Sequence, residues 1–245
     1  MLGMRIAALG AWVAAFLLVA REAWADPPDP SAGQARWLLF SSTDVWHEGG
    51  FAHGGVLWAP SGLDQQGLVF KLQAGGGLYH YTSGALGNAD VRGELISAAI
   101  LPGYRFVRDK LIVTFFLGYD YQHHKLTPDD PSASLRGAYN GVRTGFELWY
   151  EPSPLTMVAA DAQVSSIGPS YNARLAVGLR LFDAFYTGPE IQGFAAGDNY
   201  QQARVGWHLT GLRTGTIEWT TGAGWAIDSD HRSGVYGKLG LYTRH

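Results

Sequence analysis

The sequence predicts an all-β protein, a single antiparallel transmembrane β-barrel of the outer-membrane type, with about 12 strands and a range of about 10 to 14. Three observations predict this fold class. The composition suits curved strands, the residues from Arg36 onward alternate with a period of two, and short connections alternate with long ones.

The composition favours strands over helices. The chain has 33 Gly, 9 Trp, 12 Tyr and 11 Phe, and only 16% of its residues are charged. Glycine and aromatic residues disfavour helix and suit strands that bend and close. The absence of cysteine excludes a disulfide framework, and a net charge of -3 offers no basic surface, so we expect no nucleic-acid partner.

The N-terminal segment has the features of an export signal. Arg5 precedes an apolar stretch from Ile6 to Ala20, and the stretch Ala23-Trp24-Ala25 has small residues where a signal peptidase cleaves. We therefore expect residues 1–25 to be a cleaved signal peptide, residues 26–35 a disordered segment and residues 36–245 the barrel domain. The expected location is the cell outer membrane, in contact with its lipid, and the alternative is the periplasm.

Alternation defines the strands. In residues 136–150, Val142, Phe146 and Leu148 share one face, whereas Arg143 and Glu147 share the other. Read in the same way, the strands are expected near residues 36–46, 51–59, 67–81, 92–107, 111–123, 136–150, 155–167, 171–182, 185–196, 200–211, 214–227 and 234–243.

The connections support a barrel with both ends of the chain on one side. The connections at 108–110, 151–154, 183–184 and 212–213 are short and join even-numbered strands to odd-numbered ones. The longer polar stretches at 82–91, 125–135 and 228–233 join odd to even. Bacterial outer-membrane barrels have short periplasmic turns and longer external loops. The segment 60–66 is long for a periplasmic turn.

A soluble periplasmic sandwich or barrel would also alternate. Two features favour the membrane: the polar faces contain many glycines and few lysines, and aromatic residues occur near strand ends, where a membrane interface would hold them. These aromatic residues are Trp46, Trp58, Tyr79, Tyr81, Trp149 and Tyr150.

Charged residues in the middle of strands form the candidate site. An arginine facing lipid at the bilayer midplane costs about 2–4 kcal/mol, so we expect these side chains to face the lumen. They serve there either as an ion-pair network that fills the lumen or as a polar track for a saccharide or a partner. The residues are Arg143, Glu147, Arg174, Arg180, Glu190, Arg204 and Glu218.

The sequence shows no catalytic or metal-binding motif, so we expect no enzymatic activity, no metal and no cofactor. His123 and His124 are adjacent on a strand and point to opposite faces, which makes a poor chelate. A barrel enzyme acting on lipid or polysaccharide would have to use Ser165, Ser166 and a histidine such as His208. A general small porin is the other alternative.

Several segments, taken in order, resemble the cellulose biosynthesis protein BcsS family over about residues 40–244. The resemblance implies an accessory role in making or exporting cellulose, with cellulose or other components of the cellulose synthase operon as partners. The segments are Phe40-Ser41-Ser42-Thr43-Asp44-Val45-Trp46, Gly54-Gly55-Val56-Leu57-Trp58-Ala59-Pro60, Gly62-Leu63-Asp64, Leu101-Pro102-Gly103-Tyr104-Arg105-Phe106, Leu148-Trp149-Tyr150-Glu151-Pro152, Gly188-Pro189-Glu190 and Asp228-Ser229-Asp230-His231-Arg232-Ser233-Gly234.

Overall fold

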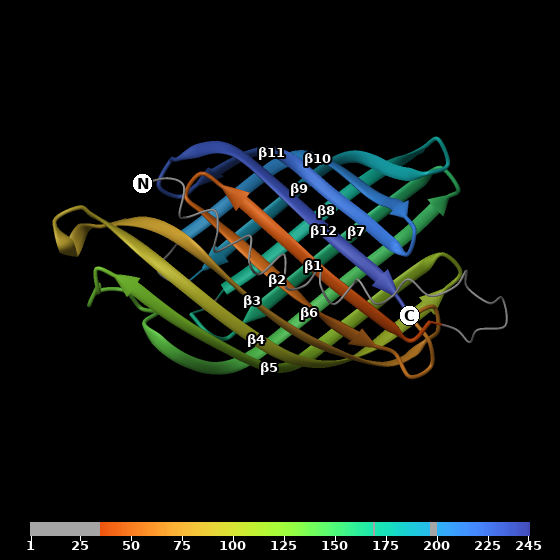
Figure 1. Ribbon diagram of the computed structural model, residues 1–245, viewed down its shortest axis with the longest axis horizontal. Coiled ribbons are helices and arrows are strands. Elements are labelled where there is room, and N and C mark those ends of the chain that lie inside the picture. Colours follow the sequence, from red (N-terminus) through yellow and green to blue (C-terminus); the bar gives the residue numbers. More distant parts are fainter. Residues whose placement is uncertain (1–34, 169, 197–199) are drawn as a thin grey trace. The chain divides into compact units, whose positions relative to one another are not determined.

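A computed structural model describes residues 35–168, 170–196 and 200–245 (Figure 1). The predicted signal peptide and residues 26–34 of the predicted disordered segment lie outside the described residues. The described residues form β1 (Trp37–Trp46), β2 (Gly49–Trp58), β3 (Gly67–Ser83), β4 (Ala89–Arg108), β5 (Leu111–Thr127), β6 (Gly137–Ser153), β7 (Thr156–Ser165), β8 (Ser170–Leu181), β9 (Phe185–Ala196), β10 (Tyr200–Thr214), β11 (Ile217–Asp228) and β12 (Ser233–Arg244), with a 3-10 turn at Gly84–Leu86.

The strands form a closed antiparallel barrel. Each strand pairs with its neighbours in sequence, and β1 closes the sheet by pairing with β12, where Ser42 lies opposite Gly240. The backbone amides of Arg36 and Trp37 both donate to the carbonyl of His245, at 2.7 and 2.8 Å, so closure extends to the last residue. The predicted barrel of about twelve strands is therefore confirmed over the described residues.

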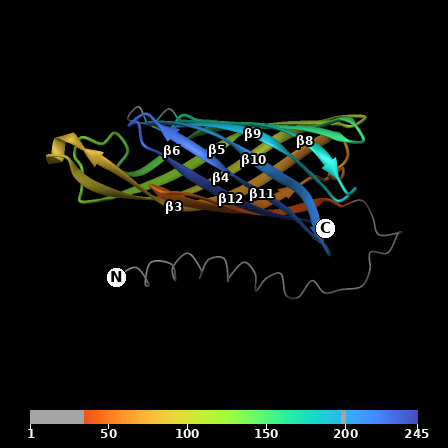
Figure 2. The ribbon, with the colours of Figure 1, turned by 90° about the horizontal axis from the view of Figure 1, so that it is seen from above.

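The two ends of the barrel differ. We call the end that holds the β1–β2, β3–β4, β5–β6, β7–β8, β9–β10 and β11–β12 connections the loop end. The opposite end, where Ala35 and His245 lie, is the terminal end. At the loop end the β3–β4 hairpin projects beyond the neighbouring strands (Figure 2), because β3 and β4 have 17 and 20 residues whereas β1 and β2 have 10 each.

One predicted turn falls wholly within a strand. Residues 212–213 were expected to form the turn after the tenth strand, but β10 continues to Thr214 and the turn contains Gly215, which has a φ of 62°. A register shift between Thr210 and Leu212, at Gly211 with a φ of 85°, causes this difference. The extra residue reverses which face the following side chains occupy, so the period-two pattern does not continue across it.

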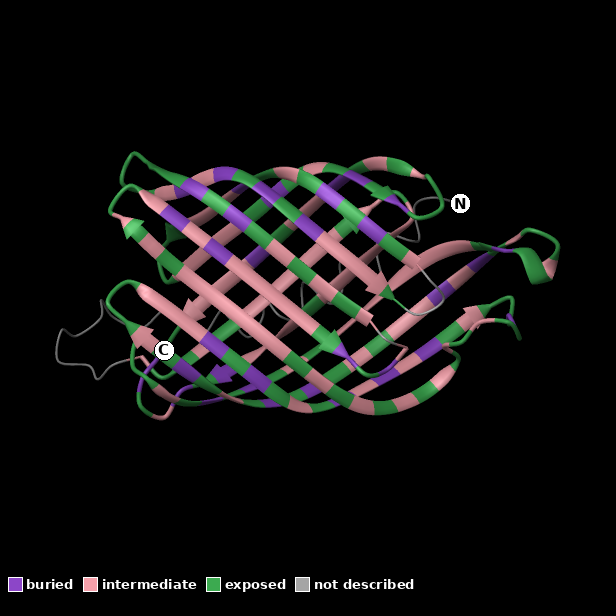
Figure 3. Cartoon of the chain, turned by 180° about the vertical axis from the view of Figure 1, so that it is seen from behind, coloured by how far each residue is buried: buried purple, intermediate pink, exposed green. Residues whose placement is uncertain are grey.

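The alternating faces separate as predicted. Buried and exposed residues alternate along most strands (Figure 3). The apolar sets expected on one face point outward, and they include exposed Phe115, Val142, Leu179 and Trp225. Outward aromatic rings near the terminal end pack in a row, with Trp37 stacked on Trp58 and Trp58 on Phe70 at centroid distances of 5.7 and 5.5 Å.

Four of the six aromatic residues that were predicted to lie at a membrane interface face the lumen. Trp46, Tyr79, Tyr81 and Trp149 lie on the strand positions that face the lumen, and Trp149 packs edge-on against the inward Tyr186. The prediction is wrong for these four residues. Proximity to a strand end does not determine the face, which depends on the position of each residue in the alternation. Trp58 and Tyr150 do face outward.

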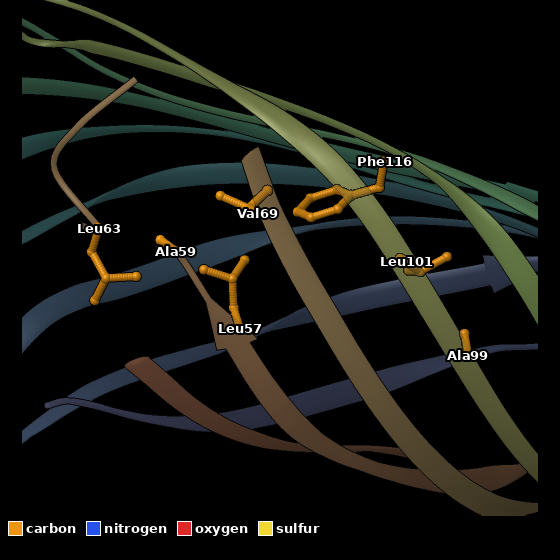
Figure 4. Close-up of a cluster of buried hydrophobic side chains, with 7 residues drawn as sticks. All are labelled: Leu57, Ala59, Leu63, Val69, Ala99, Leu101 and Phe116. Carbon is orange, nitrogen blue, oxygen red and sulfur yellow. The ribbon is translucent and has the colours of Figure 1, made fainter. Parts of the chain in front are cut away.

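An apolar cluster packs at the terminal end of the lumen, on the side of β2 to β5 (Figure 4). The segment 60–66 turns into this cluster, and Leu63 is buried with an exposed fraction of 2%. The carbonyl of Leu63 accepts a hydrogen bond of 2.5 Å from the inward guanidinium of Arg105. The length of this connection, unexpected for a periplasmic turn, thus reflects a role in filling the lumen. The cluster consists of Leu57, Ala59, Leu63, Val69, Ala99, Leu101 and Phe116.

Candidate functional site: the charged lumen

Glu190 on β9 is the centre of one charge cluster in the lumen. Its Oε2 accepts hydrogen bonds from Arg174 Nε on β8, at 2.9 Å, and from Lys238 Nζ on β12, at 2.6 Å. Its Oε1 accepts from the Tyr236 hydroxyl at 3.0 Å and from Gln192 Nε2 at 2.9 Å. The carboxylate is fully paired and 1% exposed, which is the condition under which a buried charge is tolerated.

Glycines on the intervening strands let this cluster cross the inner wall. β9 and β12 are separated by β10 and β11. A Cβ on Gly222 of β11 would lie 2.5 Å from Glu190 Oε1 and 2.6 Å from Lys238 Cε. A Cβ on Gly206 of β10 would lie 2.3 Å from the Tyr236 hydroxyl oxygen. The space that the cluster occupies is therefore created by residues without side chains.

A second cluster joins β10 to β1 next to the first. Arg204 Nη1 lies 2.8 and 2.7 Å from the two carboxylate oxygens of Asp44, and its Nε donates to Gln202 Oε1 at 2.5 Å. The guanidinium also lies 4.5 Å from the ring centroid of Phe194 and 5.0 Å from that of Tyr236. Planar stacking and two donors together suit arginine better than lysine.

On β5 to β7, a third cluster surrounds Asp120. Arg143 Nη2 lies 2.8 Å from Asp120 Oδ1, and Ser165 Oγ donates to Asp120 Oδ2 at 2.6 Å. Gln122 Nε2 donates to the same carboxylate at 3.0 Å, and the ring of His124 contacts Gln122 Oε1 at 3.1 Å. These hydrogen bonds link Asp120, Gln122 and His124 along β5 toward the loop end.

The fourth contact spans strands that are not neighbours. Lys71 on β3 forms an ion pair with Glu147 on β6, and its Nζ lies 4.2 Å from the ring centroid of Phe116. Gln73 on β3 also reaches Gln163 on β7, with the two side-chain atoms 3.5 Å apart. Such contacts cross the lumen from one side of the wall to another.

Five of the seven predicted site residues belong to these clusters: Arg143, Glu147, Arg174, Glu190 and Arg204. The other two lie near the terminal end. Arg180 is exposed and donates to the carbonyl of Asp183 at 3.1 Å, and Glu218 pairs with the exposed Arg213 at 3.1 Å.

Sequence reasoning missed several partners of these charges. The missed residues are Asp44, Lys71, Asp120, Asp161 and Lys238, and each alternates with apolar neighbours on its strand. Lys238, for example, directly precedes Leu239, which is exposed on the outer face, as is Val235 of the same parity as Leu239. Consistent use of strand parity would have identified it, because only the inward position suits its ammonium group.

The hydroxyl and imidazole groups considered for catalysis lie in separate places. Ser165 Oγ donates to a carboxylate, and the Ser166 Oγ accepts a hydrogen bond of 2.9 Å from the Val142 amide. The His208 ring contacts the Thr210 hydroxyl and the Val177 carbonyl, each at 3.0 Å. Across the described residues, no group of three or more His, Cys, Asp or Glu residues is arranged to hold a metal ion.

Asp130, in the connection between β5 and β6, couples this connection to β3. Its carboxylate accepts hydrogen bonds from Ser132 Oγ at 2.6 Å, from the Ser132 amide at 3.0 Å and from the Tyr81 hydroxyl at 3.0 Å. These hydrogen bonds, and that of the Ser132 side chain most of all, lower the pKa of Asp130 from 3.8 to about 2.

This lowered pKa predicts an acid-sensitive connection. Because the folded pKa lies below the unfolded one, the stabilisation is complete above pH 3.8 and is lost as the pH falls through about 2. Pepsin cleavage within residues 128–136 should therefore rise steeply over this interval. The Asp130→Ala variant should be cleaved readily at pH 4, and equal cleavage of the two proteins at that pH would contradict the assignment.

A family model described as cellulose biosynthesis protein BcsS matches residues 38–245. No curated protein sequence matches the chain. An outer membrane channel from Pseudomonas putida F1 is similar in structure, with a TM-score of 0.54 and 11% identity over 90% of this chain and 100% of that chain. At this identity the likeness shows the fold, which is that of an outer-membrane barrel.

Two other solved structures have lower scores. The transport unit of the autotransporter AIDA-I from Escherichia coli has a TM-score of 0.48 and 9% identity, covering 90% of this chain and 94% of that chain. The KdgM porin in complex with disordered oligogalacturonate has a TM-score of 0.43 and 10% identity, covering 84% of this chain and 98% of that chain.

Proposed function

The chain belongs to the cellulose biosynthesis protein BcsS family, and on this premise we propose that it is a non-enzymatic outer-membrane barrel that assists the production or export of cellulose. The observation that carries the proposal is the family match, which covers every strand of the barrel from Leu38 onward. The proposed partners are outer-membrane lipid together with cellulose or other components of the cellulose synthase operon.

The outer face supports a membrane location. Large apolar side chains are exposed on successive strands, among them Leu72, Ile100, Leu117 and Trp207. Lipid would cover such a surface, whereas in water a continuous apolar face is a liability. Across the described residues, no helix is long and apolar enough to cross a membrane. We place the loop end outside the cell and the terminal end in the periplasm, by the rule that periplasmic turns are short.

The side chains that fill the lumen favour an accessory role rather than the role of a wide pore or of an enzyme. Apolar residues pack at its terminal end, and the ion pairs of Glu190, Arg204 and Lys71 cross parts of its width. The hydroxyl of the candidate nucleophile Ser165 donates a hydrogen bond to Asp120 rather than to an imidazole. A nucleophilic serine requires an adjacent base that takes its proton, and the ion pair of Asp120 with Arg143 makes this carboxylate a weak base.

Deletion of the gene tests the proposal. We expect extracellular cellulose to fall severalfold while synthase activity in isolated membranes stays unchanged, because the barrel acts after or beside polymerisation. Staining of secreted cellulose and incorporation of labelled glucose by membranes measure the two quantities. Expression of the wild-type chain should restore secretion. Unchanged secretion after deletion would refute the proposed function.

A further inference from the structure

Three inward aromatic rings at the loop end have nearly parallel planes. Phe51 on β2 and Tyr79 on β3 have ring centroids 6.5 Å apart with an angle of 16° between their planes. Tyr79 and Tyr81 are 6.3 Å apart with an angle of 22°. We call Phe51, Tyr79 and Tyr81 the aromatic platform. Phe51 and Tyr79 lie at the last pairs between β2 and β3, and Tyr81 lies on the part of β3 that continues beyond β2; both strands are labelled in Figure 1.

Glycines hold two of these rings flat against the wall. A Cβ on Gly77 would lie 2.3 Å from a ring carbon of Phe51, and a Cβ on Gly93 would lie 2.1 Å from a ring carbon of Tyr79. Gly77 and Gly93 occupy inward positions on β3 and β4, so each ring rests on the backbone of the next strand. The face of each ring away from the wall is therefore directed to the lumen, and all three side chains are partly exposed.

Polar contacts fix the edge of the platform. The Tyr81 hydroxyl donates to Asp130 at 3.0 Å, and that carboxylate is held by Ser132. Elsewhere on the inner wall of the loop end, the rings of Trp46 on β1 and Tyr200 on β10 lie 6.4 Å apart. The loop end of the lumen thus presents aromatic faces bordered by hydrogen-bonding groups, which is the pattern of a ligand site.

From this arrangement we infer that the aromatic platform binds a β-linked glucan chain through the faces of its sugar rings. A β-linked glucose ring carries its hydroxyl groups around the rim and presents C–H groups on both faces, so successive rings form a flat ribbon with apolar faces and polar edges. Aromatic rings whose planes are nearly parallel, two of them lying against the wall, match such a ribbon, as aromatic side chains match the flat faces of nucleic-acid bases. The inference rests on the proposed function, which supplies the glucan.

Binding to cellohexaose tests the inference. The purified full-length barrel in detergent micelles is titrated with cellohexaose by calorimetry, and heat-modifiable gel mobility shows that each variant is folded. Tyr79→Leu and Phe51→Leu keep apolar bulk but remove a ring, so each should bind about tenfold more weakly or worse. Phe115→Leu removes an outward ring and should bind as the wild type does. Maltohexaose, whose α-links curl the chain, should bind more weakly than cellohexaose.

A second readout does not depend on the variants. Saturation transfer from the aromatic protons of the wild-type barrel should reach the C–H protons of cellohexaose. Absence of this transfer, or equal affinity of the wild type and both platform variants, would overturn the inference. The two proposals can fail separately. Normal cellulose secretion after gene deletion, together with glucan binding that depends on the platform, would refute only the accessory role. Reduced secretion without such binding would refute only the platform.

Discussion

Replacing Glu190 by alanine is expected to lower the free energy of unfolding of the barrel by about 3–5 kcal/mol. The carboxylate is the shared acceptor of Arg174 and Lys238, whose side chains are 19% and 12% exposed. Removing it leaves two largely buried cations whose remaining counter-charge is Asp161, 3.8 Å from Arg174 Nη1, and leaves Tyr236 and Gln192 without their acceptor. Both the lost attraction and the unpaired groups destabilise the variant.

Equilibrium unfolding in urea, followed by tryptophan fluorescence of the barrel in lipid vesicles, measures this change. Glu218→Ala is the matched control, because Glu218 also faces inward but pairs with Arg213, whose side chain is 67% exposed. The control should change stability by about 1 kcal/mol or less. If both variants lost the same amount, the charge cluster would have no special role in holding the barrel together.

The Gly224→Val variant is the second change with a large expected effect, a destabilisation of about 1–3 kcal/mol or more. Gly224 lies opposite Gly206 in the β10–β11 pair. A Cβ there would lie 2.2 Å from the Val205 carbonyl oxygen and 2.4 Å from the Gly206 Cα, and 2.9 Å from a ring carbon of Tyr236. The first two are backbone atoms, which move only if the strands separate. The valine also displaces the Tyr236 ring, whose hydroxyl donates a hydrogen bond to Glu190.

Gly193→Val provides the comparison on β9, since a Cβ at Gly193 has no atom within 4 Å. That variant should unfold at the same urea concentration as the wild type, whereas Gly224→Val should unfold earlier and lose part of its heat-modifiable band. Identical behaviour of the two valine variants would show that the close approach of β10, β11 and Tyr236 is unnecessary for closure.

Both variants concern the same feature, the crossing of the inner wall by Glu190 and its partners. Ion pairs between neighbouring strands, such as that of Arg143 with Asp120, can be formed by any antiparallel hairpin. Pairs such as Lys238 with Glu190 and Arg204 with Asp44 require the sheet to curve and close, because intervening strands separate the partners. These pairs therefore stabilise the closed barrel rather than its hairpins.

Much of the site was accessible from residue type and parity alone. A mid-strand arginine or glutamate has one acceptable face when the other face meets lipid, and this argument correctly placed Arg143, Arg174 and Glu190 in the charge clusters. It did not separate them from Arg180 and Glu218, which lie close enough to the terminal end to be partly or largely exposed. The depth of a residue along the barrel axis depends on the tilt and stagger of the strands, which the sequence of one strand does not specify.

The sequence by itself predicted about twelve strands and the face of most residues, because a period of two is a local property that each strand shows independently of the others. Only the tertiary structure decided that segment 60–66 turns inward, and which acid meets which base. Those outcomes depend on the stagger and curvature of the closed sheet, which bring together side chains far apart in the chain.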